Sequence, residues 1–175
     1  IDADSKTDGT PATLLWSYTT GGWVKSVSAI DTNNNDGRQE ALAGSSDSDV
    51  YCIDASQTGG GTATLVWQYD SGFGGVTCVS AIDIDHDGNQ EALVGTEQDL
   101  GYVYCVDGNG ALLWKYSISY KIQSLCPIDI DNDGRQEALA ATYQSITSVY
   151  CIDADSKIDG GTATLLWSRG VGGGP

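Results

Sequence analysis

The sequence is poor in the residues that most catalytic sites and nucleic-acid surfaces require. It contains one histidine, His86, and none of its five cysteines forms a Cys-x-x-Cys pair. A Ser-His-Asp or Cys-His site would therefore lack an independent base, and no zinc site of the usual spacing is expected. Lys and Arg number 8 against 24 Asp and Glu, which gives a net charge of −16. We expect no nucleic-acid partner, because phosphates would be repelled.

Long hydrophobic runs are also missing. No segment approaches the roughly 20 consecutive apolar residues that a membrane-spanning helix needs, so no membrane insertion is expected. Sustained helical periodicity is absent as well. Short apolar segments alternate instead with Gly, Asn and Asp, a pattern that is typical of strands joined by turns. The sequence therefore predicts an all-β fold.

The most informative feature is an acidic loop that occurs three times, at 31–40, 83–91 and 129–137. Each copy places Asp or Asn at alternate positions, then a glycine, and then a glutamate. Hard oxygen ligands at this density suit Ca²⁺ better than zinc or copper. An EF-hand has its glutamate at the twelfth loop position, whereas the second and third copies have it at the ninth. We therefore predict a shorter loop that joins two strands of a hairpin.

We expect up to three Ca²⁺ ions, one in each loop. In the second and third copies, three aspartates each give one oxygen, a backbone carbonyl gives another, and the glutamate completes the shell. The first copy is longer by one residue and richer in asparagine, so it is predicted to bind most weakly. The alternative for every copy is an Asx-turn that holds no metal. The predicted metal ligands are Asp31, Asn33, Asn35, Asp36, Glu40, Asp83, Asp85, Asp87, Asn89, Glu91, Asp129, Asp131, Asp133, Arg135 and Glu137.

The loops belong to a longer repeat. The spacing is 51 residues from Glu40 to Glu91 and 46 from Glu91 to Glu137, and Val-Tyr-Cys and Leu-Leu-Trp segments recur with it. Each unit contains four short strands, which matches one blade of a β-propeller. We predict about three blades, with the Ca²⁺ loops in β-hairpins, and an extra terminal strand. The predicted divisions are a terminal strand completing a neighbouring blade at 1–20, blades at 21–72, 73–118 and 119–169, and a Gly-rich linker at 170–175.

These residues resemble a known family. The calcium-loop segments are similar to FG-GAP and VCBS-type propeller repeats, which include the calcium loops of integrin alpha chains, and a Phe-Gly pair at Phe73 precedes the second loop. The Tyr-Cys-Ile-Asp and Leu-Leu-Trp segments resemble the outer strands of quinoprotein-type repeats. The resemblance implies a calcium-stabilised propeller and leaves the ligand open.

The two ends of the chain repeat each other. Residues 1–17 and 152–168 differ only where Thr7, Thr10 and Pro11 stand in the first copy. Three blades are too few to close a ring, since propellers have roughly four to eight. The chain is therefore expected to be a fragment, half of a six-bladed ring, or a subunit of an open-ended assembly. Exchange of the matching end strands between identical subunits is one route to such polymers.

Cysteines and tryptophans carry less specific predictions. Cys52, Cys105 and Cys151 occupy equivalent positions and are expected to be small buried residues. A disulfide that involves Cys78 or Cys126 stays open, and these two are expected on opposite faces of their strands. Four of the five tryptophans recur at one strand position, which favours core packing. Trp23 lies outside that series and is predicted to be exposed.

These observations favour a non-enzymatic, calcium-binding repeat protein with a structural or adhesive role. Ordinary sites of this kind need more calcium than the cytosol offers, so an extracellular or cell-surface location is expected. Self-association or other surface proteins are the expected partners. The alternative is a lectin-like or polysaccharide lyase propeller domain with a glycan ligand.

Overall fold

The computed structural model describes residues 13–32, 38–72, 74–97, 100–143, 148–154 and 161–170. Every regular element in these ranges is a strand, and none of them contains a helix that could cross a membrane. The all-β prediction is confirmed. The strands are β1 (Trp16–Ser17), β2 (Val24–Ile30), β3 (Glu40–Ser45), β4 (Asp49–Asp54), β5 (Gly61–Thr62), β6 (Thr64–Asp70), β7 (Val76–Ile82), β8 (Glu91–Thr96), β9 (Gly101–Val106), β10 (Leu112–Ile118), β11 (Lys121–Ile128), β12 (Glu137–Tyr143), β13 (Ser148–Asp153), β14 (Gly161–Thr162) and β15 (Thr164–Gly170).

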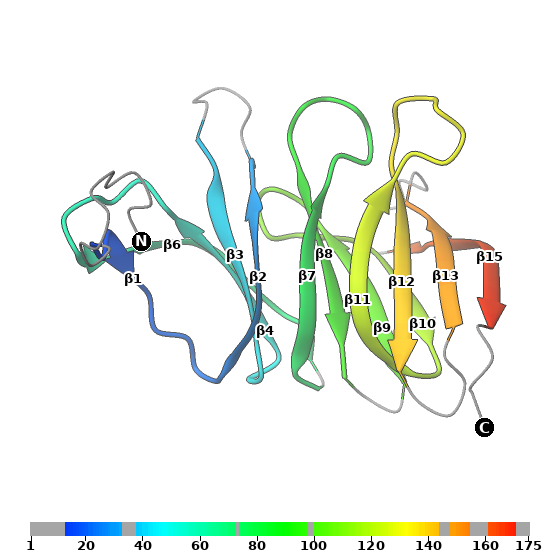
Figure 1. Ribbon diagram of the computed structural model, residues 1–175, viewed down its shortest axis with the longest axis horizontal. Coiled ribbons are helices and arrows are strands. Elements are labelled where there is room, and N and C mark those ends of the chain that lie inside the picture. The colour runs from blue at the N-terminus through cyan, green and yellow to red at the C-terminus, as the bar shows by residue number, and fades with distance from the viewer. Residues whose placement is uncertain are drawn as a thin grey trace, which may run out of the picture.

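Twelve of the strands form three antiparallel four-stranded sheets that follow one another along the chain. Sheet 1 has the order β2-β3-β4-β6, sheet 2 the order β7-β8-β9-β10, and sheet 3 the order β11-β12-β13-β15. Figure 1 shows the sheets side by side along the long axis of the molecule, with sheet 3 nearest the C-terminus. The four-stranded units predicted from the repeat are therefore present. The described residues form no closed ring of sheets.

Two very short strands add parallel pairs that the repeat pattern did not predict. In sheet 2, β14 pairs with the outer edge of β10, with Trp114 opposite Gly161. In the same way β5 pairs with β1, with Trp16 opposite Gly61. Each pair joins the segment before one outer strand to the tryptophan strand of the preceding repeat. Of the predicted terminal segment 1–20, only residues from 13 onward are described, and β1 is the strand they form.

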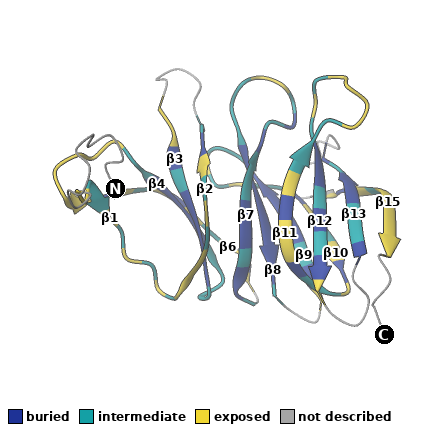
Figure 2. Cartoon of the chain, viewed as in Figure 1, coloured by how far each residue is buried: buried dark blue, intermediate teal, exposed yellow. Residues whose placement is uncertain are grey.

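The core lies between neighbouring sheets. Cysteine and aliphatic side chains of sheet 1 pack with those of sheet 2, and a second cluster joins sheets 2 and 3. Figure 2 shows this as dark, buried strands in the middle of the molecule and an exposed β15 at one end. Trp67 and Trp114 are 7% and 0% exposed, which confirms core packing at these two positions, whereas Trp167 on β15 is 43% exposed.

All five cysteines are free thiols. Cys52, Cys105 and Cys151 are fully buried, as the repeat predicted. Cys78 is buried and Cys126 is exposed. The prediction of opposite faces is wrong, because Cys78 lies four residues before Ile82 and Cys126 two residues before Ile128, and these isoleucines pair with the loop glutamates of their sheets in the same way. The burial differs because sheet 3 covers this face of sheet 2, whereas none of the described sheets covers it in sheet 3. Burial raises the pKa of the Cys52 thiol to about 12, which keeps it protonated and inert at neutral pH.

Candidate metal centre

The second and third acidic loops each connect the first two strands of a sheet. The loop at 83–90 follows β7 and precedes β8, and the loop at 129–136 joins β11 to β12. Figure 1 shows both loops projecting from the same side of the molecule. Gly88 and Gly134 have φ of +90° and +93°, a left-handed conformation that side chains rarely allow. These glycines make the reversal that curls each loop around its aspartates.

Carboxylate oxygens gather inside both curls. One oxygen each from Asp83, Asp85 and Glu91 lie within 4.8 Å of one another in the second loop. In the third loop the corresponding set is Asp129, Asp131 and Asp133. Each set contains three of the four carboxylates predicted as ligands for its loop. The first two aspartates belong to both sets, whereas the third aspartate joins only the set of the third loop and the glutamate only that of the second.

Hydrogen bonds from backbone amides hold these aspartates in place. The first aspartate of each loop accepts a bond from the loop glycine, from Gly88 to Asp83 at 3.2 Å and from Gly134 to Asp129 at 3.1 Å. Asn89 N–H donates to Asp87 Oδ1 at 2.8 Å. Asx-type bonds and inward carboxylates therefore coexist, since each carboxylate has a second oxygen or lone pairs left for a cation. The carbonyl ligands predicted at Asn89 and Arg135 stay a prediction.

The closing glutamate is buried beneath its loop. Glu91 is 8% exposed, and its Oε2 accepts a bond from the N–H of Ile84 at 3.1 Å. Burial, together with the charges of Asp85 and Asp83, raises the pKa of Glu91 to about 7. Burial likewise raises the pKa of Glu137 in the third loop. A buried carboxylate crowded by like charges is a group whose ionised form a cation would stabilise.

One oxygen in the second loop lacks a partner. Asp83 Oδ1 is buried and accepts no hydrogen bond, whereas its Oδ2 is bonded to Gly88. Buried polar atoms in proteins are nearly always satisfied, so an orphaned carboxylate oxygen calls for a ligand. His86, in the same loop, is exposed and has φ of +59°. Its ring lies beside Gly134 of the third loop, and the two residues line one pocket with Asp83 and Asp129.

The first loop is described only at its two ends. Asn33, Asn35 and Asp36 lie outside the described residues, whereas Asp31 and Glu40 lie within them. Glu40 Oε2 accepts bonds from the N–H and hydroxyl of Thr32 at 3.1 and 2.9 Å. The buried glutamate with a bond to its own loop is thus common to all three copies. The prediction that the first site is the weakest stays a prediction.

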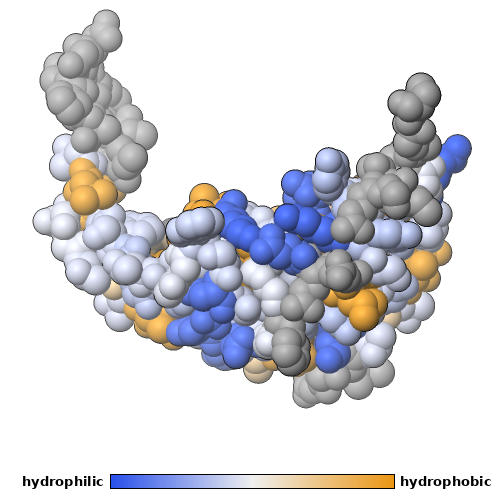
Figure 3. Space-filling view, turned by 90° about the horizontal axis from the view of Figure 1, so that it is seen from below, coloured by the Kyte–Doolittle hydropathy of each residue, from blue (hydrophilic) through white to orange (hydrophobic). Residues whose placement is uncertain are grey.

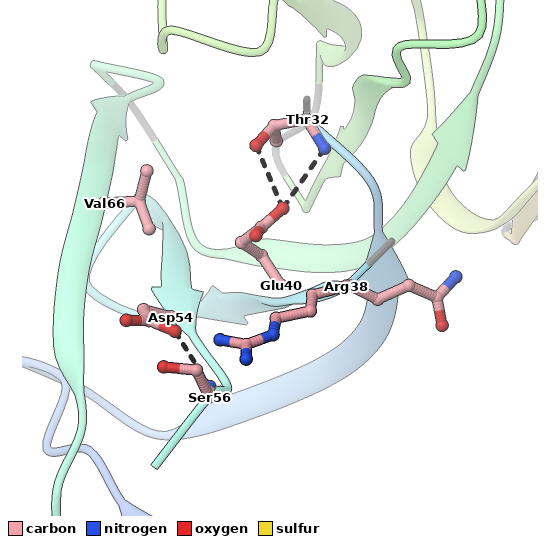
Figure 4. Close-up of a pocket in the computed structure, with 7 residues that line it drawn as sticks. Thr32, Arg38, Glu40, Asp54, Ser56 and Val66 are labelled. Atoms are coloured by element: carbon pink, nitrogen blue, oxygen red, sulfur yellow. Dashed lines mark hydrogen bonds between the residues drawn. The ribbon is translucent and has the colours of Figure 1, made fainter. Parts of the chain in front are cut away.

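A pocket adjoins the base of this first loop. Figure 4 shows Glu40 bonded to Thr32 on one side and Asp54 bonded to Ser56 on the other, with Arg38 extending toward Asp54. The bond from Ser56 and the charge of Arg38 lower the pKa of Asp54. Asp54 ends β4 in the repeated Tyr-Cys-Ile-Asp segment. Sequence analysis did not predict that this aspartate lies beside an acidic loop, although its recurrence in every repeat could have indicated a role there.

The third loop has an equivalent pocket. Its walls are Ile130, Glu137, Asp153 and Leu166 together with two of the loop aspartates. Asp153 occupies the place that Asp54 has in sheet 1. The repeat therefore brings a further carboxylate to the edge of the site, where it adds negative charge without joining the inner set.

Glutamines tie each loop to the preceding one. Gln90, next to Glu91, accepts a bond from the N–H of Asp31 at 2.9 Å, and the Gln90 N–H donates to the Asp31 carbonyl at 2.7 Å. Gln136 accepts in the same way from the N–H of Asp83 at 3.1 Å. Sequence analysis assigned no role to these glutamines, although each precedes the loop glutamate. Each glutamine belongs to the following sheet and holds the backbone of the first aspartate of the preceding loop in place.

The opposite end of the sheets carries charged groups of both signs. Glu97 bonds to Lys25 of sheet 1 at 2.6 Å and to Lys121 of sheet 3 at 3.1 Å. The bond from Lys25 is the main reason that the pKa of Glu97 is lowered. Figure 3, viewed from this side, shows strongly hydrophilic surface near the middle and hydrophobic patches toward both ends of the long axis. This ion triad joins three sheets and contains no metal-type cluster.

Comparisons with known proteins show a similarity of fold and no family. No family model matches the chain, and no curated protein matches it. Among solved structures, the chain is similar to the V. cholerae biofilm matrix protein Bap1, with 20% identity and a TM-score of 0.58. The match covers 86% of this chain and 21% of Bap1, so the chain spans about a fifth of that protein. A complex of BBS1N with ARL6DN also matches, at 6% identity, a TM-score of 0.35, 84% of this chain and 56% of the other.

Proposed function

We propose that this chain is a calcium-stabilised segment of a β-propeller, with a structural or adhesive role and no catalytic one. The observation that carries the proposal is the second loop. There a buried glutamate with a pKa of about 7 shares a 4.8 Å cluster with Asp83 and Asp85, and one oxygen of Asp83 has no partner. Such a site is destabilising when its carboxylates are ionised and nothing offsets their charge.

Calcium fits the donor set better than its competitors. The ligands are all oxygens, and neither cluster contains His or Cys, which zinc and copper prefer. Mg²⁺ demands near-octahedral geometry and keeps several of its waters, so it seldom occupies a cage of four carboxylates. The acidic chain, with a net charge of −16, gains most from a divalent cation that accepts many carboxylates.

The proposed propeller fold and the proposed extracellular location are supported by different observations. The sheets are four-stranded antiparallel meanders, and their first strands β2, β7 and β11 lie next to one another, as the inner strands of blades do. Bap1, which shares this fold, is a biofilm matrix protein. A matrix outside the cell supplies the millimolar calcium that fills sites of modest affinity. The arrangement of the sheets, the similarity to Bap1 and the calcium available outside the cell all support a calcium-loaded extracellular scaffold.

The test is thermal unfolding with calcium, with magnesium, and with chelator, combined with calorimetric titration. Calcium is expected to raise Tm and to bind in at least two sites, and magnesium is expected to do much less. The double variant Asp85→Asn, Asp131→Asn should lose most of the calcium effect. Asp70→Asn is the matched control, because Asp70 is exposed at the end of β6 and outside both clusters. An unchanged Tm on adding calcium to the native chain would refute the proposal.

A glycan-binding role is the second candidate, and Trp23 is the observation in its favour. The Trp23 side chain is 82% exposed, next to Val24 at 50%. An exposed indole can stack on a sugar ring. Binding to a glycan array that is lost in Trp23→Ala would favour this role, and cleavage of an acidic polysaccharide would favour the lyase alternative.

A further inference from the structure

The same sheet-to-sheet contact occurs twice inside this chain. In each case a front face, made of one residue from each strand of a sheet, packs on the back face of the next sheet. The front faces are Ile30, Leu42, Val50 and Trp67 in sheet 1 and Ile82, Leu93, Val103 and Trp114 in sheet 2. The back faces include Val76 and Val79 in sheet 2 and Ile122 and Leu125 in sheet 3. Every one of these side chains is at most 9% exposed.

The two outermost faces are the unpaired halves of this contact. Sheet 3 repeats the front face with Ile128, Leu139, Val149 and Trp167. The first three of these are only partly buried, and Trp167 is 43% exposed. Sheet 1 repeats the back face with Val24 and Val27, which are 50% and 71% exposed, whereas their equivalents Val76 and Val79 are 0% and 7% exposed. One end of the molecule therefore carries the surface that the other end fits.

The short parallel strands indicate the register of such a contact. Inside the chain, Ala163 N–H donates to the Lys115 carbonyl where β14 joins β10, and Ala63 N–H donates to the Ser17 carbonyl where β5 joins β1. The β1 pair, Trp16–Ser17, is identical in sequence to Trp167–Ser168 on the outer edge of sheet 3. The β15 edge of a second copy can replace β1 beside β5 without changing a residue of the pair.

A polar contact follows from the same register. Gln90 and Gln136 each accept a hydrogen bond from the first loop aspartate of the preceding sheet. Gln39 is the equivalent glutamine of sheet 1 and is exposed. With the sheets stacked in register, Gln39 of one copy accepts from the N–H of Asp129 in the other.

We propose that sheet 3 of one copy docks on sheet 1 of a second copy, head to tail, and that β15 of the first takes the place of β1 beside β5 of the second. The joint rests on the structural role proposed above, because it makes this chain a subunit of that scaffold. The contact is heterologous, so two copies close a ring or many copies form a filament, depending on the rotation between them.

One residue sets the strength of the joint. Gly44 and Gly95 lie where the next sheet presses closest. A Cβ at Gly44 would be 2.5 Å from Val76 of sheet 2, and one at Gly95 would be 2.7 Å from Ile122 of sheet 3. Ala141 occupies this position in sheet 3. The Ala141 methyl holds the docking sheet slightly away, so the joint is weaker than the internal contacts and reversible. Ala141→Gly is expected to tighten association.

The test measures molar mass by light scattering over a range of concentrations, in calcium. The native chain should exceed its 18.3 kDa monomer mass as concentration rises. Val27→Asp on the back face and Trp167→Glu on the front face should each weaken association by at least about tenfold, since a charge would be buried unpaired. Both side chains are exposed, so the subunit itself should stay folded, which circular dichroism checks. Leu100→Asp is the control, because Leu100 is 52% exposed in the connection between β8 and β9, outside both faces.

Mixing the two variants separates a head-to-tail joint from a symmetric one. Each variant keeps the face that the other has lost, so an equimolar mixture should form a dimer and nothing larger. Failure of the mixture to associate, or a native chain that stays monomeric, would overturn the joint, and a partner other than a second copy would then cover the faces. The calcium-dependent Tm of Val27→Asp, which should stay monomeric, is measured in parallel. A calcium response of this variant together with a native chain that does not associate overturns the joint alone. Association of the native chain without a calcium response of the variant overturns the metal role alone.

Discussion

Replacing Glu91 with glutamine should stabilise the chain when calcium is absent and destabilise it when calcium is present. Glu91 is 8% exposed, and its pKa rises from 4.5 to about 7 because of burial and the neighbouring aspartates. At pH 8 without calcium, holding this group ionised costs the folded state at most about 3 kcal/mol. Glutamine keeps the shape and an acceptor oxygen for the Ile84 N–H, and it removes the charge. The metal-free variant should therefore be more stable than the native chain.

The pH dependence follows from the direction of the shift. Between pH 4.5 and 7 the folded state of the metal-free chain binds more protons than the unfolded state, because the pKa of Glu91 is higher when folded. Stability contributed by protonated Glu91 is therefore complete below pH 4.5 and lost as pH rises through about 7. The advantage of Glu91→Gln should shrink toward zero at pH 5, and urea unfolding in chelator at pH 5 and 8 measures it.

Calcium should invert the order of the two proteins. The native carboxylate gains an ion that the neutral amide binds poorly, so in calcium the variant should be the less stable. Glu97→Gln is a matched control, because Glu97 bonds to two lysines far from the loops. This control should lose about 1 kcal/mol or less, to the same extent with and without calcium. A Glu91→Gln variant less stable than the native chain in both conditions at pH 8 would refute this account of the site.

Three further predictions concern the scaffold. Trp114→Phe should cost about 1 kcal/mol more than Trp67→Phe in urea unfolding, because Trp114 Nε1 donates to the Ala154 carbonyl at 3.1 Å and buried Trp67 Nε1 has no partner. Gly95→Ala should destabilise the chain by about 1–3 kcal/mol, since the new Cβ would lie 2.7 Å from Ile122 of sheet 3, and a crystal structure should show sheets 2 and 3 displaced. Cys126 alone should react within minutes with a thiol reagent in the folded chain, because the other four thiols are buried, and mass spectrometry counts the adducts.

The repeat made most of the strand architecture predictable. Alternating apolar residues, turn glycines and the three copies of the loop together predicted four-stranded units, and sheets 1, 2 and 3 have that form. These features depend on local spacing, which a sequence records directly.

Features that depend on a neighbouring repeat were missed. The two-residue strands β5 and β14 have no periodicity of their own, and they exist because a tryptophan strand of the preceding repeat offers a free edge. The bond from Asp83 N–H to Gln136 joins residues 53 positions apart. Sequence position alone does not report such contacts.

The glutamine bonds link the two proposed properties of this chain, metal binding and stacking of sheets. In each of the two described pairs, the first aspartate of one loop is held by a glutamine that immediately precedes the buried glutamate of the next. A cation that draws the carboxylates of one loop together therefore also fixes the backbone N–H of the first aspartate. That N–H donates the hydrogen bond to the glutamine of the following sheet. Loss of the cation would loosen the hairpin and the contact between sheets at once. Calcium should accordingly stabilise the stack as a whole, and a joint built from the same contact would share that dependence.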